Sequence, residues 1–334
     1  MNEKIKIGII GCSKIAKTST IPAILKSKNF HLEFIGSTSE KKANEYSSEF
    51  NCKKYGSYDD VLNDQNVHAV YISTPIGTHE EWVLKSANAG KHILCEKSST
   101  TSYFSAKKMV DACNKNKVRL MECLMFRFHP SHQKVKDFIQ NGNLGKLFSF
   151  SGRYGFPPIQ KNDIRYNKSL GGGILNDAGC YPICASRILF DSESEGIFCE
   201  LSIDEESQVD TKASIFMNFN QKKISQSVVG YDLFYQSMYS LWGSEGSLNL
   251  TRAYNVPPDM AVTLSVNTND FKKILSIEPV DHFEMMFNSF SNELKNPGTS
   301  SYIFEDDLLK QAKIMEAARI SCNEQRYVKI DEIH

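Results

Sequence analysis

The sequence carries no excess of charge of either sign. Its 334 residues include 39 Lys plus Arg and 39 Asp plus Glu, which gives a formal net charge of zero. Proteins that bind nucleic acid or an anionic membrane mainly through charge usually have a basic excess. We therefore expect neither nucleic acid nor a membrane among the partners of this protein.

Long apolar runs and paired cysteines are also missing. No apolar segment approaches the ~18 residues that a membrane span requires, and Met1 to Gly8 has the pattern of a charged strand rather than a signal peptide. The nine cysteines, an odd number with no Cys-x-x-Cys pair, fit neither a secreted disulfide framework nor a zinc site. With 41% hydrophobic and 23% charged residues, the composition is that of a globular protein. We expect reduced thiols, a cytoplasmic location and no bound metal.

The first part of the sequence alternates between strand and helix patterns. Apolar runs with strand character alternate with helical patterns of about 10–15 residues, which indicates crossover connections and a parallel sheet. Strands are expected at 4–10, 32–36, 67–72, 92–95 and 118–124, and helices at 15–26, 40–50, 79–89 and 103–115.

From about Met125 the pattern changes to alternating apolar and polar residues, which is typical of antiparallel strands. Strands are expected at 147–154, 198–204, 212–219, 224–229, 237–242 and 247–251, and helices at 132–140, 171–190, 281–294 and 306–323. We therefore predict an α/β protein with a Rossmann domain, a doubly wound parallel sheet, at 1–124. An α+β domain with a large, open, mostly antiparallel sheet follows at 125–334, with the last helix free to pack back on the first domain.

A glycine-containing turn follows the first strand. Gly8-x-x-Gly11-x-Ser13-x-x-Ala16 is a variant of the dinucleotide fingerprint, in which Gly11 permits the tight turn and Ala16 keeps helix and strand close. The N-terminus of the next helix, with unpaired N–H groups and a partial positive charge, suits a pyrophosphate. Ser13 stands where the fingerprint usually has its middle glycine. The other residues expected to line this turn are Cys12, Lys14 and Ile15.

The end of the second strand bears on the choice of nucleotide. An acidic residue there would accept the ribose 2′-hydroxyl and repel a 2′-phosphate. No acid stands directly at this tip, whereas the hydroxyls of Ser37 and Thr38 and the ammonium of Lys42 suit a phosphate. We therefore expect NADP rather than NAD. If Glu40 instead of Ser37 occupied the ribose position, NAD would be favoured, and Lys41 can equally belong to a solvated helix face.

Two further segments, 90–98 (GKHILCEKS) and 171–182 (GGGILNDAGCYP), carry a resemblance when they are taken with the fingerprint. Together they resemble the glucose–fructose oxidoreductase-like, or Gfo/Idh/MocA, family. Further matches at 73–79, 125–130 and 242–248 extend the likeness over most of the chain. The segments 163–166 (DIRY) and 79–82 (HEEW) are most similar to bacterial sugar 3-ketoreductases that act on nucleotide-linked deoxysugars.

The resemblance implies hydride transfer between a nicotinamide and a sugar carbonyl or hydroxyl. Reduction of a ketone also needs a proton, which a tyrosine can supply when a nearby ammonium stabilises its phenolate. Tyr181 and Lys97 are the expected pair, and Asp177, on the same helix face as Tyr181, orients the substrate or Lys97. Cofactor contacts are expected from Ser73, Thr74, Pro75, His79, Glu96, Lys97 and Arg165, and substrate contacts from Lys97, Arg127, Arg165, Tyr166, Asp177 and Tyr181.

One residue departs from the family pattern. The family has a proline after the lysine, often with a cis peptide bond, whereas Ser98 follows Lys97 here. A cis bond before a residue other than proline costs ~2.5–4 kcal/mol. We therefore expect a trans bond, which would alter the reach of Lys97.

Other functions and simpler roles stay open on the sequence alone. Tyr181 can be a core tyrosine, Lys97 a surface lysine, and Arg165 the ion-pair partner of a nearby acid. The same residues can serve a dehydrogenase of a free sugar or a trans-dihydrodiol, an NAD-dependent glycoside hydrolase, or a non-catalytic NADP-binding protein. Since the broad antiparallel sheet must bury its uncovered face, we expect a homodimer or homotetramer through that sheet.

Overall fold

The chain forms two compact units, and the computed structural model describes residues 4–334. The first unit runs to Met125 and also contains Phe283–Leu309. The second comprises Phe126–His282 and Lys310–His334. The sequence predicts a single boundary after residue 124, so the return of the chain to the first unit at Phe283 is a difference from that prediction.

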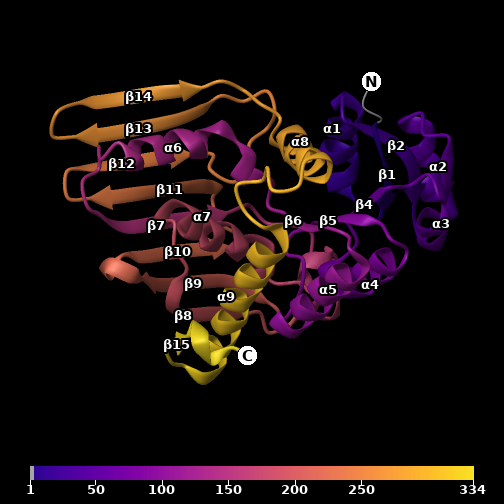
Figure 1. Ribbon diagram of the computed structural model, residues 1–334. Coiled ribbons are helices and arrows are strands. Elements are labelled where there is room, and N and C mark those ends of the chain that lie inside the picture. Colours follow the sequence, from indigo (N-terminus) through magenta and orange to yellow (C-terminus); the bar gives the residue numbers. More distant parts are fainter. Residues whose placement is uncertain (1–3) are drawn as a thin grey trace. The chain divides into compact units, whose positions relative to one another are not determined.

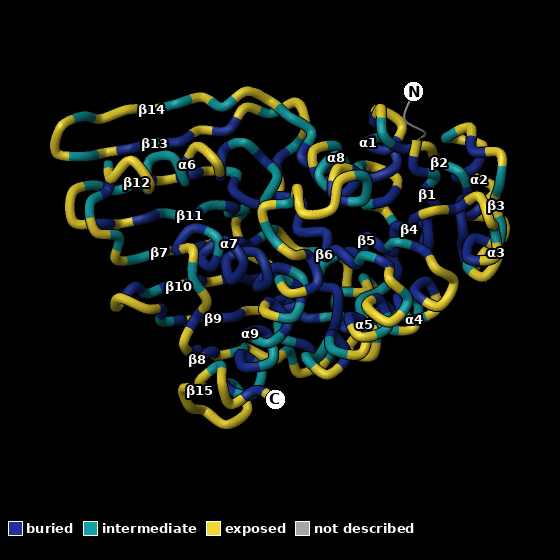
Figure 2. Tube along the Cα trace, in the orientation of Figure 1, coloured by how far each residue is buried: buried dark blue, intermediate teal, exposed yellow. Residues whose placement is uncertain are grey.

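A six-stranded parallel sheet forms the centre of the first unit (Figure 1). Its strand order is β3-β2-β1-β4-β5-β6, the order of dinucleotide-binding sheets. The strands are buried over most of their length (Figure 2), as expected for a parallel sheet covered on both faces. Their bounds are β1 Ile5–Ile10, β2 Phe30–Gly36, β3 Lys54–Gly56, β4 Ala69–Ile72, β5 His92–Glu96 and β6 Leu120–Cys123.

Helices connect these strands, and the predicted parallel sheet is confirmed. The helix expected at 15–26 begins with a π-helical turn, Ala16–Thr20, before it continues as α1. The short strand β3 and helix α3 are absent from the sequence prediction, because three and six residues show too little periodicity. The helices are α1 Ile21–Lys26, α2 Glu40–Glu49, α3 Tyr58–Asn63, α4 His79–Asn88, α5 Tyr103–Asn116 and α8 His282–Lys295.

The segment Phe283–Leu309 joins the first unit through apolar and ionic contacts. Phe287, in α8, is fully buried, and its ring lies 5.4 Å from that of Phe30. The guanidinium of Arg119 pairs with Glu293 at 2.6 Å and with Glu305 at 2.9 Å. Such contacts depend on tertiary structure, which explains why the strand–helix alternation alone does not reveal them.

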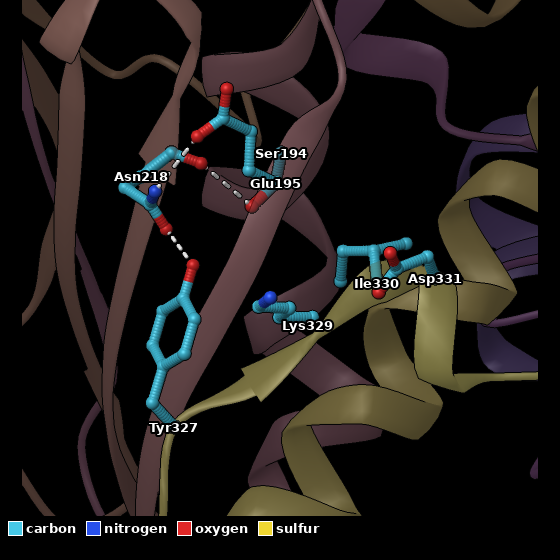
Figure 3. A pocket seen from close by; sticks show the side chains of 7 residues that line it. All are labelled: Ser194, Glu195, Asn218, Tyr327, Lys329, Ile330 and Asp331. Atoms are coloured by element: carbon cyan, nitrogen blue, oxygen red, sulfur yellow. Dashed lines mark hydrogen bonds between the residues drawn. The ribbon is translucent and has the colours of Figure 1, made fainter.

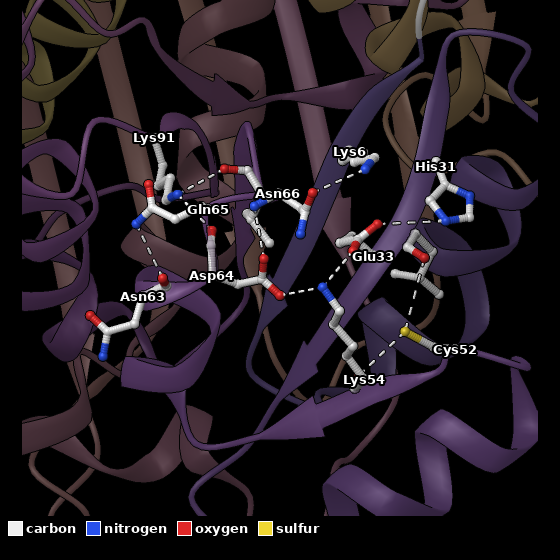
Figure 4. A network of polar contacts seen from close by, with 12 residues as sticks. Lys6, His31, Glu33, Cys52, Lys54, Asn63, Asp64, Gln65, Asn66 and Lys91 are labelled. Carbon is white, nitrogen blue, oxygen red and sulfur yellow. Dashed lines mark hydrogen bonds and ion pairs between the residues drawn. The ribbon is translucent and has the colours of Figure 1, made fainter.

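An ionic network closes the amino-terminal edge of the parallel sheet (Figure 4). The Lys54 ammonium donates to Glu33 at 2.7 Å and to Asp64 at 2.6 Å. The Lys91 ammonium donates to the backbone carbonyls of Asp64 and Val67 at 2.9 and 2.8 Å. These contacts tie the starts of β3, β4 and β5 together, while the loops at the carboxyl ends of the strands carry the sequence motifs.

The second unit is built on a nine-stranded sheet of order β14-β13-β12-β11-β7-β10-β9-β8-β15. Neighbouring strands are antiparallel except β7 and β10, so the predicted mostly antiparallel sheet is confirmed. The bounds are β7 Leu147–Gly155, β8 Ser194–Ile203, β9 Asp210–Phe219, β10 Ile224–Gly230, β11 Gln236–Gly243, β12 Gly246–Thr251, β13 Val262–Thr268, β14 Lys272–Ile277 and β15 Val328–Lys329.

Helices cover one face of this sheet: α6 Pro130–Gln140, α7 Cys180–Phe190 and the later part of α9 Phe304–Glu324 (Figure 1). The side chains of Phe150 and Leu241 point to this face and are fully buried. On the opposite face Trp242 and Ile274 are 63% and 76% exposed. The sheet therefore buries one face within its own unit and leaves apolar side chains on the other.

Replacing Phe287 tests whether α8 is part of the first unit's core. Phe287→Ala is expected to lower the free energy of unfolding by about 3–5 kcal/mol, because it removes a fully buried ring. Phe104→Ala, which truncates a 64% exposed side chain, is the control and should change it by less than about 0.5 kcal/mol. Denaturant titration measures both, and equal effects would contradict the assignment.

Candidate active site

The turn after β1 packs closely against the loop after β4. Gly11 has a φ of +106°, and a Cβ atom there would lie 3.0 Å from the carbonyl carbon of Ser73. The Ser13 hydroxyl accepts from the amide of Ala16 at 3.1 Å and donates to the Ser73 hydroxyl at 2.8 Å. That hydroxyl donates in turn to the Gly11 carbonyl at 2.8 Å. Ser13, at the position of the usual middle glycine, thus begins the helix and joins the two loops.

The end of β2 carries a hydroxyl rather than a carboxylate. Ser37 directly follows the strand and is 6% exposed. Ser39 is the N-cap residue of α2, where its hydroxyl accepts from the amide of Lys42 at 3.4 Å. Glu40 is the first residue of α2 and is exposed. Ser37 therefore occupies the tip of the strand, and Glu40 lies three residues further along the chain, in the helix.

Polar side chains from three segments converge at this strand end. Burial raises the pKa of the Cys12 thiol, whereas a hydrogen bond with Ser37 and the Lys42 ammonium lower it. Burial also raises the pKa of the Tyr58 hydroxyl, which hydrogen bonds with Thr38 lower. The Cys12 thiol donates to the Gly36 carbonyl at 3.7 Å, which places this side chain at the end of β2.

His79 links the loops that follow β4 and β5. It is the first residue of α4 and is fully buried. Its Nε2 lies 2.8 Å from the Thr74 carbonyl and its Nδ1 lies 3.2 Å from the Ser98 carbonyl. Burial lowers the pKa of this imidazole. Both ring nitrogens thus face the backbone, so His79 braces the two loops, and its predicted contact with a cofactor stays a prediction.

The carboxylate of Glu96, at the end of β5, lies beside Tyr71 of β4. The Tyr71 hydroxyl donates to its Oε1 at 2.5 Å, and the Lys97 amide donates to its Oε2 at 3.2 Å. Burial and then the Glu96 carboxylate raise the pKa of Tyr71 well above its ordinary value, so this hydroxyl stays protonated. Tyr71 therefore orients the Glu96 carboxylate, which is the group predicted to contact the ribose.

The peptide bond between Lys97 and Ser98 is cis, and the expectation of a trans bond is wrong. The residues that follow it are held by tertiary contacts. The Ser98 carbonyl faces His79, and the Ser99 amide donates to Glu122 Oε1 at 2.8 Å. The general preference for a trans bond before a residue other than proline does not include the effect of such tertiary contacts.

The Gly-rich segment of the second unit packs against two other segments. Gly173 has a φ of +112°, and a Cβ atom there would collide with the Asp210 carboxylate. A Cβ atom on Gly172 would collide with the Arg165 carbonyl oxygen. The Asp210 carboxylate also accepts from the amide of Leu175 at 2.6 Å. These glycines therefore let the start of the helical segment approach β9 and the segment around Arg165.

Asp177 and Arg165, predicted to have separate roles, form an ion pair. Arg165 Nε donates to Asp177 Oδ2 at 2.7 Å, and its Nη1 donates to Asp163 at 3.1 Å. Asp177 and then its hydrogen bond raise the pKa of Arg165 despite burial. Asp177 lies in a π-helical turn, Leu175–Gly179, that precedes Tyr181 in α7. The shared helix face expected for Asp177 and Tyr181 stays a prediction.

Tyr181 is 3% exposed and lies in an aromatic cluster of the second unit. Its ring centroid is 5.2 Å from that of Tyr154 and 5.6 Å from those of Phe126 and Tyr254. Contacts on three sides fix the plane of the ring. This cluster positions the phenol that the sequence proposes as a proton donor.

The other predicted residues are divided between the two units. Tyr166 meets the ring of Tyr231 at 5.6 Å, and Arg127 lies in the 3₁₀ turn Met125–Phe128. The remaining candidates lie in the first unit: Lys14 and Ile15 in the first helical turn after β1, and Pro75 in the loop after β4. Sequence reasoning misses the site neighbours Tyr58, Tyr71, Asp210, Tyr231 and Tyr254, since they stand outside every motif and are brought close only by folding.

A separate hollow lies at the edge of the nine-stranded sheet, where β15 meets β8 (Figure 3). Asn218 donates to Glu195 at 3.1 Å, and the Tyr327 hydroxyl donates to Asn218. These polar groups pair with one another, and the hollow contains none of the predicted site residues. Its lining is Ser194, Glu195, Asn218, Tyr327, Lys329, Ile330 and Asp331.

Two further findings concern metal ligands and membrane-spanning helices. Among residues 4–334, no three or more His, Cys, Asp and Glu side chains are grouped so that they could hold a metal ion. In the same part of the chain, no helix has the length and apolar character that crossing a membrane requires.

Known proteins resemble this chain over nearly its full length. It is 28% identical over 323 residues, 95% of this chain and 97% of the relative, to dTDP-3,4-didehydro-2,6-dideoxy-alpha-D-glucose 3-reductase of Saccharopolyspora spinosa. It is also 28% identical to D-xylose 1-dehydrogenase (NADP(+)) 2 of Haloferax volcanii, with coverage of 97% and 99%. A crystal structure of a 3-ketoreductase from Actinomadura kijaniata, in complex with NADP and TDP-benzene, superposes with a TM-score of 0.91 at 28% identity and covers 96% and 98% of the two chains.

Family models match both units. Residues 5–123 match the model described as "Oxidoreductase family, NAD-binding Rossmann fold", and residues 132–249 match the "GFO/IDH/MocA C-terminal domain". These two matches cover most of the chain and agree with the strand order and the glycine turn described above. The chain therefore belongs to the Gfo/Idh/MocA family of oxidoreductases.

Proposed function

We propose that this protein is an NADP-dependent ketoreductase of a nucleotide-linked sugar. The observation that carries this proposal is its likeness, through both domains, to 3-ketoreductases. One of these relatives acts on a dTDP-linked deoxysugar by name, and another is solved with NADP and TDP-benzene bound. Solved structures of the latter enzyme also include variants in which one tyrosine or one lysine is replaced.

The loops of the first unit fit a dinucleotide phosphate. At Gly11 only a hydrogen atom fits between the β1 turn and Ser73, which leaves the backbone of the turn open to a pyrophosphate. We assign the 2′-phosphate to Ser37, Thr38 and Lys42, because a hydroxyl-rich strand tip with an ammonium attracts that group. Glu96 is assigned to the ribose on the nicotinamide side. When bound, the cofactor supplies the hydride.

Tyr181 and Lys97 are proposed to act on the same carbonyl group. The Tyr181 hydroxyl donates its proton to the ketone oxygen as the carbonyl carbon gains the hydride, which yields an alcohol. The Lys97 ammonium stabilises the phenolate that remains. Asp177 orients the sugar hydroxyls or Lys97. The aromatic cluster around Tyr181 supports this role, since it holds the plane of the ring.

Oxidation of a free sugar is the second candidate. The full-length likeness to a D-xylose 1-dehydrogenase favours it. The same residues would catalyse this oxidation, which is the reverse of the proposed reduction. Assays in both directions, with free sugars and with UDP- or dTDP-linked sugars, separate the two functions. Turnover restricted to free sugars would replace the first proposal with the second.

The open face of the nine-stranded sheet is the proposed oligomer interface. Trp242, Val228 and Ile274 are between 50% and 76% exposed on this face. An apolar surface of this kind on a broad sheet is typical of a protein interface. A homodimer or homotetramer would bury it, which sedimentation of the native protein tests.

The state of the cysteines supports a cytoplasmic location. All nine are free thiols, and eight of them are buried. The cytoplasm keeps thiols reduced, whereas secreted proteins with this many cysteines usually form disulfides. We therefore retain the cytoplasm as the proposed compartment.

Adding a methyl group at Gly11 tests the dinucleotide site. Gly11→Ala is expected to weaken NADPH binding at least tenfold, because the positive φ and the contact with Ser73 both oppose a side chain. Gly90→Ala is the matched control, since Gly90 also has a positive φ but has no atom within 4 Å of the added Cβ. Fluorescence titration with NADPH measures both, and similar affinities for the two variants would contradict the assignment.

Removal of the Lys42 ammonium tests the choice of nucleotide. Lys42→Ala is expected to weaken NADPH binding about tenfold and to leave NADH binding within about twofold, because only NADPH carries the 2′-phosphate. Lys41→Ala, which removes the neighbouring charge, should change neither affinity. Calorimetry compares the nucleotides, and equal or tighter NADH binding by the native protein would refute the assignment.

Loss of the Tyr181 hydroxyl tests the proton donor. Tyr181→Phe keeps the ring in its cluster and is expected to lower kcat with the nucleotide-linked sugar at least 100-fold, the usual scale for a lost general acid. NADPH binding should stay unchanged. Tyr254→Phe removes a buried hydroxyl from the same cluster and should leave kcat within about threefold. Steady-state kinetics decides, and unchanged turnover in Tyr181→Phe would exclude the role.

A further inference from the structure

The backbone carbonyl of Cys180, the first residue of α7, accepts a hydrogen bond from a buried side chain of α9. Gln311 Nε2 donates to this carbonyl at 2.9 Å, and Gln311 Oε1 accepts from Arg187 Nη1 at 2.8 Å. Gln311 and Arg187 are only 2% and 3% exposed. Glu193 balances the charge, since it accepts from Arg187 Nε and Nη2 at 2.6 and 3.0 Å. This series, from an arginine through an amide to a backbone carbonyl, is the first relay.

A second relay of the same kind holds the other end of the segment 171–180. Arg319, also in α9, donates from Nη2 to Asn176 Oδ1 at 2.6 Å. Asn176 is buried, and its Nδ2 donates in turn to the Gly171 carbonyl at 3.1 Å. Arg319 also pairs with Glu316 at 3.2 Å. The two relays therefore reach the first and the last residue of this segment.

The partners determine which way each amide of a relay points. A guanidinium has only donors, and a backbone carbonyl only accepts. The side chain between them must therefore accept at one end and donate at the other, which a carboxamide does and an ionised carboxylate cannot do. A charged donor on the amide oxygen also polarises the amide and strengthens the hydrogen bond that its N–H group makes.

The segment between the relays ends in irregular helix. Its last turn, Leu175–Gly179, is π-helical, a geometry that is rare and occurs mostly as single turns, often at functional sites. Pro182, which follows shortly in α7, has no N–H group to donate to this turn. Hydrogen bonds from α9 therefore support a stretch of backbone that carries Asp177 and ends directly before Tyr181.

We propose that the two relays position Asp177 and Tyr181, and that Gln311 and Arg319 are positioning residues of the active site. The residue directly before each of the first two takes part in one relay, so a hydrogen bond anchors the chain one residue away from each side chain. The direction of the Tyr181 hydroxyl depends on this backbone as well as on the rings around it. The chemical consequence of the positioning rests on the proposed function.

Gln311→Glu tests the first relay. The carboxylate can still accept from Arg187 but cannot donate to the Cys180 carbonyl. We expect kcat to fall about tenfold, since a misplacement of ~1 Å can cost 100-fold, and NADPH binding to stay within about twofold. Gln325→Glu is the matched control, because Gln325 also donates to a carbonyl, that of Cys322 at 2.7 Å, but is exposed and outside both relays. It should leave kcat within about twofold.

A double-mutant cycle separates positioning from a general loss of structure. In a Tyr181→Phe background no hydroxyl remains to be misplaced, so Gln311→Glu should change kcat less than about twofold. Damage to the whole fold would instead lower kcat by the same factor in both backgrounds.

Asn176→Asp makes the corresponding change in the second relay. It keeps an acceptor for Arg319 and loses the donor to the Gly171 carbonyl. We expect kcat/KM for the sugar to fall about tenfold, and by less than about twofold in an Asp177→Asn background. This variant also tests the proposal independently if Gln311→Glu does not fold.

Hydrogen exchange followed by mass spectrometry tests the relays without turnover. In Gln311→Glu and in Asn176→Asp, the amides of 171–181 should exchange at least about fivefold faster, while those of 5–16 in the first unit keep their rates. Unchanged exchange in 171–181, faster exchange throughout the protein, an equal effect of Gln325→Glu, or equal kinetic effects in both backgrounds would each overturn the proposal.

The exchange measurement also separates this proposal from the proposed function. A protein whose segment 171–181 exchanges faster as expected, but which reduces no nucleotide-linked sugar, would overturn the proposed function and leave the relays intact. The two cycles are then measured in the oxidation of a free sugar, where equal factors in both backgrounds would again exclude the positioning role.

Discussion

The close approach of the β1 turn to the end of β4 determines the arrangement of the loops at the carboxyl ends of the parallel strands, where we propose that the cofactor binds. Only a hydrogen atom fits at Gly11, and the hydroxyls of Ser13 and Ser73 join the two loops. His79 continues this connection from the loop after β4 to the one after β5. The loops at the carboxyl ends of the strands thus form one hydrogen-bonded series, while ion pairs close the opposite edge of the sheet. A fixed set of backbone N–H groups at one edge is what phosphate recognition requires.

In the second unit, the aromatic side chains and the charged side chains near the Gly-rich segment have different roles. Packed rings hold the Tyr181 phenol, whereas Arg165 forms ion pairs with Asp177 and Asp163. A proton donor needs a fixed direction, which packing provides without charge. The Gly-rich segment joins these functions, because its missing side chains allow the helix that carries Asp177 and Tyr181 to begin against β9.

Periodicity predicts most of this architecture because each long element shows its pattern several times. It does not reveal β3, α3 or β15, which are too short to show a period. The strands β13 and β14 are also missing from the sequence prediction, although they are seven and six residues long. Gly11 and Ser37, which the motifs single out, directly follow β1 and β2 in the structure, but the motifs do not tell which residues form contacts with one another. The ion pair of Asp177 with Arg165 and the contact of His79 with the Ser98 carbonyl join residues that are 12 and 19 positions apart. The assignment of Phe283–Leu309 to the first unit has the same origin, since it depends on which core receives Phe287.

The central claim is that this chain transfers hydride from NADPH to a ketone on a nucleotide-linked sugar. Incubation with NADPH deuterated at the transferable position, followed by mass spectrometry of the sugar, tests it most directly. The account predicts that a dTDP-linked ketosugar gains one deuterium on carbon and becomes an alcohol. A dTDP-linked sugar that gains no deuterium, while a free sugar exchanges deuterium with the same cofactor, would contradict it.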